Sequence, residues 1–305
     1  MKRLLSVPEL ATAASLFSAT QTVSQYAAGP LPPAEVPVLA VLSPAKSLDL
    51  SPPDLTLPTT EPALMSDART LMRSTRALTQ KRIRELMNLS VDLAKLNHER
   101  FHSFELPFSN GNALPAGLAF NGDVYRGLDA RSLSVAQLEW AQDRIAILSG
   151  LFGLLRPLDL IQPYRLEMGT RLKTRRGANL YAFWGDRVAR ELRGRLEGHD
   201  DPTLVNLASN EYFKVARGKT FATPVVECVF EDWKSRPEEG SVIGFLAKYA
   251  RGLMARYMVT ERIDRADGLK EFNLQRYRYQ PARSTATRWV FARRFVPVET
   301  SRRLD

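Results

Sequence analysis

Short apolar runs along the chain predict a set of β-strands. Val36–Leu42 is apolar throughout, and Pro37 stands at its entry, where the strand ladder needs no N–H donor. Apolar runs of four to eight residues bounded by turn residues are typical of strands. The further runs interpreted as strands are Gly117–Phe120, Ile145–Leu148, Thr203–Ala208, Val225–Phe230, Val242–Leu246 and Trp289–Phe295.

Longer stretches with apolar positions three or four residues apart predict helices. Within one of them, Trp184, Val188 and Leu192 follow at intervals of four and form a single apolar stripe. Strands and helices alternate irregularly, which favours a mixed α/β (α+β) fold over a regular Rossmann fold or barrel. The predicted helices are Ala63–Arg76, Lys81–Met87, Val91–Phe101, Val135–Ala141, Leu180–Leu196 and Ala247–Val259.

The first 35 residues differ in composition from the rest of the chain. They are rich in Ala, Ser and Thr, carry few charges and end in a proline-rich stretch. We interpret them as a disordered extension or the product of an early start codon, and an organellar transit segment is the alternative. No linker or internal repeat divides the remainder, so residues 36–305 are expected to form a single domain.

The charge pattern indicates a polyanionic partner. The formal net charge is +10, and the basic residues concentrate in two segments, 69–102 and 251–305. The longest nearly unbroken apolar run, Ile145 to Leu155, is far shorter than the ~20 residues of a membrane span. DNA is therefore a more plausible partner than a membrane, although a GC-rich genome also enriches arginine without any functional reason.

Two motifs suggest metal or thiol chemistry, and both have a simpler interpretation. His98–His102 reads HERFH, the spacing of a zinc protease helix, but Arg100 would place a cation beside the metal. We interpret it as an exposed helix end and expect no metal and no cofactor. Cys228 lies in an apolar strand without a neighbouring base, which indicates a buried, inert thiol.

Polar and charged residues gather where several predicted strands end, the usual place for ligand-binding groups in α/β proteins. A further group lies in a loop after Leu148 that is rich in Gly and Pro. If these segments converge, they form a cationic cleft containing carboxylates; structural salt bridges would use the same residues. The candidate cleft residues are Ser43, Lys46, Asn121, Asp123, Tyr125, Arg156, Tyr164, Arg165, Glu167, Asn206, Ser209, Glu211, Lys214, Lys248 and Arg251.

Two short basic helices joined by Asn88-Leu89-Ser90 form a candidate DNA-binding unit. Thr79 is a suitable N-cap for the first helix. Helix–hairpin–helix units bind the DNA backbone through the backbone amides of the hairpin and through flanking lysine and arginine side chains. The connection in this chain lacks the glycines that are usual in such hairpins. A solvated amphipathic helix pair is the alternative. The candidate DNA-binding residues are Lys81, Arg82, Arg84, Asn88, Ser90 and Lys95.

Taken together, the motifs resemble the YaaA family of bacterial peroxide-stress proteins, over about residues 38 to 295. The resemblance rests on SPAKSLDL (Ser43–Leu50), FNGDVYRGL (Phe120–Leu128), LSGLFGLLRPLDLIQPYRLEMGTRL (Leu148–Leu172), LYAFWGD (Leu180–Asp186), LVNLASNEYFK (Leu204–Lys214) and KYARGLMARY (Lys248–Tyr257). It implies one α/β domain of unusual fold with a positively charged cleft. It also implies binding of double-stranded and branched DNA through a helix–hairpin–helix element, which maps onto Leu78–Phe101 here, and protection against peroxide by limiting free intracellular iron.

Two classes of function remain open at this stage. One is a cytoplasmic, monomeric DNA-binding stress protein, and the other is an enzyme acting on a nucleotide or nucleobase in the cleft. An exposed basic stripe favours DNA, whereas an enclosed pocket favours chemistry on a small molecule.

Removal of residues 1–34 is expected to leave the thermal unfolding midpoint unchanged, because their composition buries too little apolar surface to order the segment. Differential scanning calorimetry of the full and shortened chains measures this. A midpoint lowered by tens of degrees would show that the segment packs on the domain.

Overall fold

The computed structural model describes residues 38–197, 201–218, 222–236 and 239–295. The predicted extension, residues 1–35, lies outside these ranges, as does the start of the first predicted strand. Within them, the longest helices are too short or too polar to cross a membrane. The expected mixed α/β fold is confirmed.

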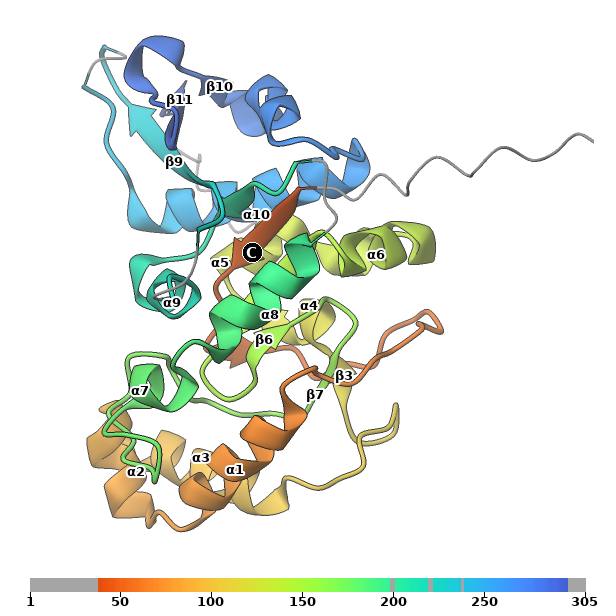
Figure 1. Ribbon diagram of the computed structural model, residues 1–305, viewed down its shortest axis with the longest axis vertical. Helices are drawn as coiled ribbons and strands as arrows, with labels where there is room; N and C mark the ends of the chain where they lie inside the picture. Colours follow the sequence, from red (N-terminus) through yellow and green to blue (C-terminus); the bar gives the residue numbers. More distant parts are fainter. Residues whose placement is uncertain (1–37, 198–200, 219–221, 237–238, 296–305) are drawn as a thin grey trace, which may run out of the picture. The chain divides into compact units, whose positions relative to one another are not determined.

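One seven-stranded sheet forms the centre of the described domain (Figure 1). Its five inner strands are parallel, and an antiparallel strand closes each edge. Every residue of the inner strand β1 is fully buried, as the interior of a parallel sheet requires. Across the sheet the strands are β10 (Arg278–Tyr279), β11 (Arg288–Arg294), β9 (Val225–Trp233), β8 (Leu204–Asn206), β1 (Leu39–Leu42), β5 (Ile145–Ser149) and β6 (Gly153–Leu155).

The order of the strands reverses at β1. Ala40 is paired with Ile145 of β5 on one side and with Val205 of β8 on the other. The chain thus leaves β1 for one side of the sheet and later returns to the opposite side. Loops that leave the carboxyl ends of such strands diverge and open a crevice, which is where open α/β sheets bind ligands.

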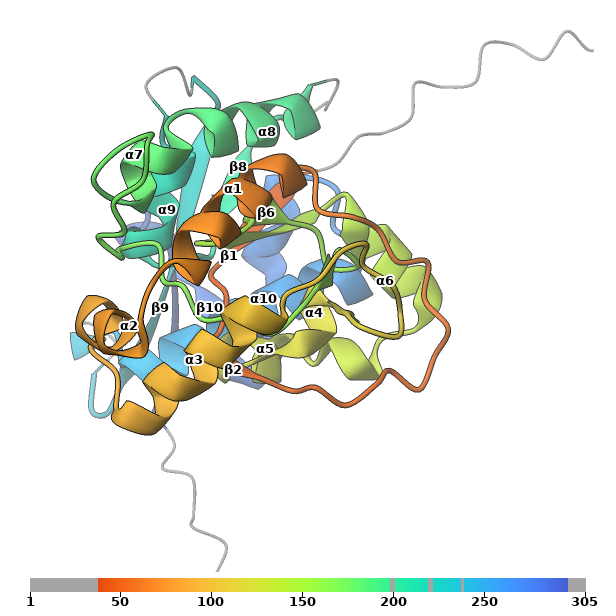
Figure 2. The same ribbon diagram turned by 90° about the horizontal axis from the view of Figure 1, so that it is seen from below.

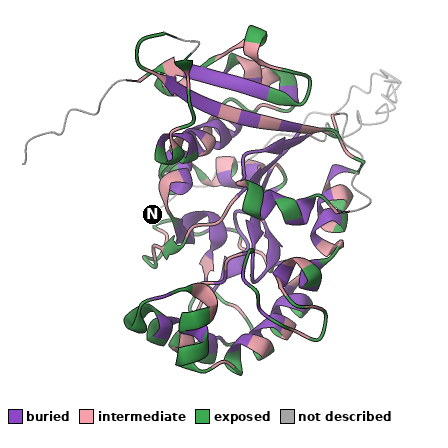
Figure 3. Cartoon of the chain, turned by 90° about the vertical axis from the view of Figure 1, so that its left-hand side faces the viewer, coloured by how far each residue is buried: buried purple, intermediate pink, exposed green. Residues whose placement is uncertain are grey.

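Helices cover both faces of the sheet (Figures 1 and 2). Helices α8 and α9 pack on one face, and α5, α6 and α10 pack on the other. Figure 3 shows the buried residues concentrated on the central strands and the inward faces of the helices. The α-helices are α1 (Met65–Arg76), α2 (Gln80–Met87), α3 (Val91–Ser103), α4 (Ala116–Ala119), α5 (Asp123–Leu128), α6 (Val135–Gln142), α7 (Leu180–Trp184), α8 (Arg187–Leu196), α9 (Asn210–Ala216) and α10 (Gly244–Thr260).

Shorter elements complete the domain. Two small antiparallel pairs lie beside the main sheet, β2 with β4 and β3 with β7. Their bounds, and those of the 3₁₀ helices, are β2 (Ser47–Leu48), β3 (Leu114–Pro115), β4 (Phe120–Asn121), β7 (Leu160–Ile161), η1 (Ala130–Ser132), η3 (Ala266–Glu271), η4 (Leu274–Arg276) and η5 (Pro281–Arg283).

Helices α5 and α10 meet backbone to backbone at two glycines. A Cβ atom on Gly127 would lie 2.2 Å from the carbonyl oxygen of Tyr249, and one on Gly252 would lie 1.8 Å from that of Val124. Neither distance is sterically possible, so only glycine fits at these positions. The contact holds the start of α5 beside the first half of α10.

Two predicted strands are wrong. Most of Gly117–Phe120 is the short helix α4, where the Gly117 N–H donates to the carbonyl oxygen of Pro157 at 2.8 Å. Val242–Leu246 runs into the start of α10 instead of forming a strand. Its side chains Val242 and Phe245 are 54% and 60% exposed, so the apolar run does not mark a buried segment.

The predicted helix Leu180–Leu196 is broken into α7 and α8 at Gly185. This glycine has a φ of +49°, which ends α7 in the left-handed region. The stripe of Trp184, Val188 and Leu192 is fully buried as expected, although its first member belongs to α7.

Replacing Gly252 by alanine is expected to destabilise the domain by about 3 kcal/mol or more, because the new methyl group must push α5 and α10 apart. Urea unfolding followed by circular dichroism gives the free energy. The matched control is Gly194→Ala on α8, where no atom lies within 4 Å of the added Cβ. It should stabilise the helix by roughly 0.5–1 kcal/mol. Equal effects of the two substitutions would contradict the close contact.

Candidate functional site

A cavity of about 440 Å³ opens at the strand reversal, beside the carboxyl ends of β1 and β8. Its walls come from the loop after β1, the start of α5, the loop before α7, the start of α9 and one face of α10. Twelve predicted cleft residues line it: Ser43, Lys46, Asn121, Asp123, Tyr125, Tyr164, Arg165, Glu167, Ser209, Glu211, Lys248 and Arg251.

Ser43 ties the walls of the cavity together. Its hydroxyl oxygen accepts a hydrogen bond from the backbone N–H of Ser209 at 2.9 Å and lies 3.3 Å from the Ser209 hydroxyl. Its carbonyl oxygen accepts a hydrogen bond from the Tyr125 hydroxyl at 3.0 Å. The loop after β1 is thereby joined to both α9 and α5.

Glu167 holds two of the cavity's cations. Its Oε2 lies 3.0 Å from Nζ of Lys46, and its Oε1 lies 3.5 Å from a terminal nitrogen of Arg165. The other two carboxylates also have partners. Glu211 accepts the backbone N–H of Gly169 at 2.8 Å, and Asp123 pairs with Arg126 one turn along α5.

Lys248 and Arg251 lie one turn apart on α10. Among the described residues, no carboxylate oxygen lies within 4.0 Å of either side chain. The Nε of Arg251 is buried and has no hydrogen-bond partner there. Burial lowers the pKa of Arg251, and the negative charge of Glu227 opposes that shift. These two cations are therefore the unpaired positive charge of the cavity.

Three tyrosines supply the apolar wall. Burial raises the pKa of Tyr125, Tyr164 and Tyr212 well above the ordinary value, so all three are neutral near pH 7. The Tyr164 hydroxyl lies 2.6 Å from Oγ of Ser149, and that of Tyr125 donates to the protein backbone. The rings of Tyr125 and Tyr164 pack against Phe120, at 5.2 and 6.4 Å between ring centres, so only a small part of each tyrosine faces the cavity. Tyr212 was not among the predicted residues, although its neighbour Glu211 was.

The three other predicted cleft residues do not line the cavity. The Nε of Arg156 lies 3.2 Å from the fully buried carboxylate of Asp159, and Asn206 caps its own strand end through the N–H of Ala208 at 2.9 Å. Lys214 lies over the ring of Tyr181 at 4.8 Å. Each of these three side chains therefore interacts with a neighbouring residue outside the cavity.

The predicted basic helices are present as α2 and α3. The Thr79 and Ser90 hydroxyls cap their N-termini, and Asn88 ends α2 in the left-handed region in place of a glycine. Ile83 and Leu89 are buried beneath the pair. The predicted DNA-binding residues all lie exposed on it: Lys81, Arg82, Arg84, Asn88, Ser90 and Lys95.

The helix pair and the cavity are electrostatic neighbours. Burial lowers the pKa of Arg100 on α3, and the positive charge of Arg165 in the cavity wall lowers it further. On the same helix, the rings of His98 and His102 lie 4.2 Å apart between their centres and are tilted by 31° to each other. Within the described ranges, no three His, Cys, Asp or Glu side chains are grouped as metal ligands.

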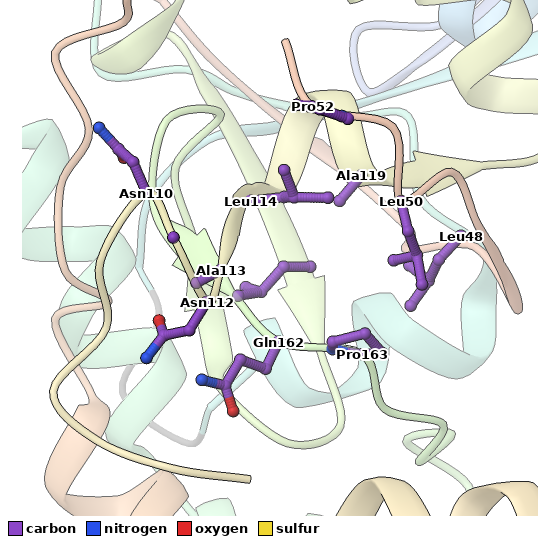
Figure 4. Close-up of a pocket in the computed structure, with 12 residues that line it drawn as sticks. Leu48, Leu50, Pro52, Asn110, Asn112, Ala113, Leu114, Ala119, Gln162 and Pro163 are labelled. Atoms are coloured by element: carbon purple, nitrogen blue, oxygen red, sulfur yellow. The ribbon is translucent and has the colours of Figure 1, made fainter. Parts of the chain in front are cut away.

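A second cavity of about 320 Å³ lies between β2 and the β3–β7 pair (Figure 4). Leu48, Leu50, Leu114 and Ile161 make it largely apolar. The side-chain amide of Gln162, which also lines the cavity, forms two hydrogen bonds with the backbone of Glu105. Nothing in the sequence analysis predicted this cavity.

Comparison with known proteins decides the family. Residues 38–283 match the family described as peroxide stress protein YaaA. The chain belongs to this family. Curated relatives named UPF0246 protein are 54% identical in Caulobacter vibrioides and 50% in Phenylobacterium zucineum, each over 256 residues. A relative from Bordetella pertussis is 49% identical over 257 residues. Each match covers 84% of this chain and at least 95% of the relative.

In this YaaA-family chain the single cysteine is not accessible to reagents. Cys228 lies on β9 and is 1% exposed. Burial raises the pKa of its thiol to about 12, so almost none is thiolate at pH 8.

Iodoacetamide or hydrogen peroxide at pH 8 is therefore expected to leave Cys228 unmodified in the folded protein and to modify it fully in guanidinium chloride. Intact-mass spectrometry measures the added mass. Fast modification under native conditions would show that the strand opens.

Proposed function

We propose that this protein binds duplex and branched DNA in the cytoplasm during the response to hydrogen peroxide. The observation that carries the proposal is the exposed basic surface of the α2–α3 pair, in a chain of the peroxide stress protein YaaA family. Lys81, Arg84 and Lys95 have no carboxylate within 4.0 Å among the described residues, so they are available to phosphates. Arg82 is the exception, with Glu85 at 3.4 Å.

The mode of binding that we propose is contact with the DNA backbone. Lysine and arginine side chains neutralise phosphates, and the backbone amides and capping hydroxyl near Asn88 and Ser90 add hydrogen bonds. Phosphate contacts carry no sequence information. The affinity should therefore depend weakly on sequence and steeply on salt.

The proposal includes protection of DNA through a lower level of free intracellular iron. Ferrous iron reduces hydrogen peroxide to hydroxyl radicals, which break DNA, so lowering free iron limits this damage. Electron paramagnetic resonance of chelatable iron in cells with and without the gene tests this part, and equal iron levels during peroxide exposure would refute it.

A second candidate function is an enzyme acting on a nucleotide or nucleobase. The cavity at the strand reversal favours it, because the cavity brings cations, carboxylates and neutral tyrosines together around one volume of about 440 Å³. Backbone contacts alone do not require such a cavity. Both functions are compatible in one chain, since the proposed DNA-binding residues and the cavity residues are different side chains.

Replacing Lys81, Arg82 and Arg84 by alanine is expected to flatten the log–log salt dependence of DNA affinity by about two to three units, because each phosphate contact contributes roughly −0.9. Fluorescence anisotropy with a labelled duplex and a labelled four-way junction at several salt concentrations measures the slope.

The matched control removes the same charge elsewhere, through alanine at Arg190, Lys234 and Arg236, which are also exposed. Its slope should stay close to that of the unmodified protein. If the helix variant keeps the original slope, the DNA surface lies elsewhere, and the basic stretch Arg276–Arg294 becomes the next site to test.

A further inference from the structure

We propose that the cavity at the strand reversal binds a nucleoside monophosphate unit, with the phosphate at Lys248 and Arg251 and the base against the tyrosine wall. The inference rests on the second candidate function and names its ligand. It follows from three features of the cavity: its unpaired cations, its apolar wall and its size.

The unpaired cations define the phosphate end. Lys46 and Arg165 already share Glu167, whereas Lys248 and Arg251 have no carboxylate oxygen within 4.0 Å among the described residues. A buried N–H group without an acceptor is costly, and Nε of Arg251 is such a group. An anion between the two side chains removes that cost.

Phosphate suits this pair better than a carboxylate does. A phosphate monoester carries close to two negative charges at pH 7, which matches two cations one helical turn apart. The planar arginine fork binds two phosphate oxygens at once, and lysine adds a compact point charge. The tight contact between α5 and α10 keeps α10 in place, so the two cations are held at the cavity before a ligand arrives.

The apolar wall defines the base end. Tyr125 and Tyr164 are neutral and line the cavity, and at 6% and 5% exposure each presents a small part of its surface to a ligand. Nucleic-acid bases stack on aromatic side chains without regard to base identity. The exposed side chain of Asn121 lies in the same lining, and an amide offers both donors and acceptors to a base edge.

Size separates a nucleotide from smaller anions. The volume of about 440 Å³ lies within the range of small-molecule sites and far exceeds the needs of inorganic phosphate. The nucleotide has two sources, the free molecule and a unit turned out of a DNA strand bound along α3. Both present the same phosphate, sugar and base, and the experiment separates them.

Isothermal titration of the full chain with AMP, GMP, CMP, adenosine, ribose 5-phosphate and inorganic phosphate tests the assignment. Monophosphates are expected to bind at least tenfold more tightly than ribose 5-phosphate, adenosine or phosphate. Absence of monophosphate binding at millimolar concentration overturns the proposal. Equal affinity for ribose 5-phosphate and the monophosphates also overturns it, because the base then contributes nothing.

Two variants locate the phosphate. Lys248→Gln and Arg251→Gln should each weaken AMP binding at least tenfold and leave adenosine binding unchanged. Lys248 is exposed, so its variant keeps the fold if the Arg251 variant does not. The matched control, Arg190→Gln on the exposed side of α8, should bind AMP normally. Unchanged AMP affinity in Lys248→Gln, with the fold intact, places the phosphate elsewhere and refutes the assignment.

A competition experiment separates the two sources and keeps this proposal distinct from DNA binding. Saturating AMP should lower the affinity for a four-way junction if the ligand is a nucleotide of the DNA, and leave it unchanged if the ligand is free. DNA binding without any AMP binding overturns the cavity assignment alone. AMP binding without DNA affinity supports the cavity and refutes the first candidate function.

Discussion

The backbone contact between α5 and α10 is the constraint on which the cavity depends. Gly127 and Gly252 allow the two helices to approach until each glycine touches a carbonyl oxygen of the other helix. This approach places the first turn of α5 opposite the face of α10 that carries Lys248 and Arg251. Any side chain at either glycine would move one wall of the cavity away from the other.

Some charged side chains of the cavity have ion-pair or hydrogen-bond partners, and others have none among the described residues. Glu167 neutralises one pair of cations, and backbone or local partners occupy the remaining carboxylates. Among the described residues, Lys248 and Arg251 have no carboxylate oxygen within 4.0 Å, and Nε of Arg251 is buried without a hydrogen-bond partner. A buried polar group without a partner is costly in a folded protein, and the proposed anion would supply that partner.

The two candidate functions use different surfaces that lie close together. The proposed DNA surface consists of exposed cations on the α2–α3 pair, whereas the proposed nucleotide site is a cavity that combines exposed and buried groups. Arg100 and Arg165 stand between them as like charges.

The sequence by itself determined most elements and twelve of the residues that line the cavity, although not Tyr212. Apolar runs predicted the central strands because a buried parallel strand needs apolar residues on both faces, and polar residues at strand ends predicted Ser43, Ser209 and Glu211. It could not show that Val242–Leu246 opens α10, because an apolar run does not reveal whether its side chains are covered. Nor could it separate Lys214, which packs on a neighbouring ring, from Lys248, which has no carboxylate near it in the described residues. Whether a charged side chain has a partner depends on the distance between their atoms. Only the tertiary structure brings residues that are far apart in the sequence within that distance.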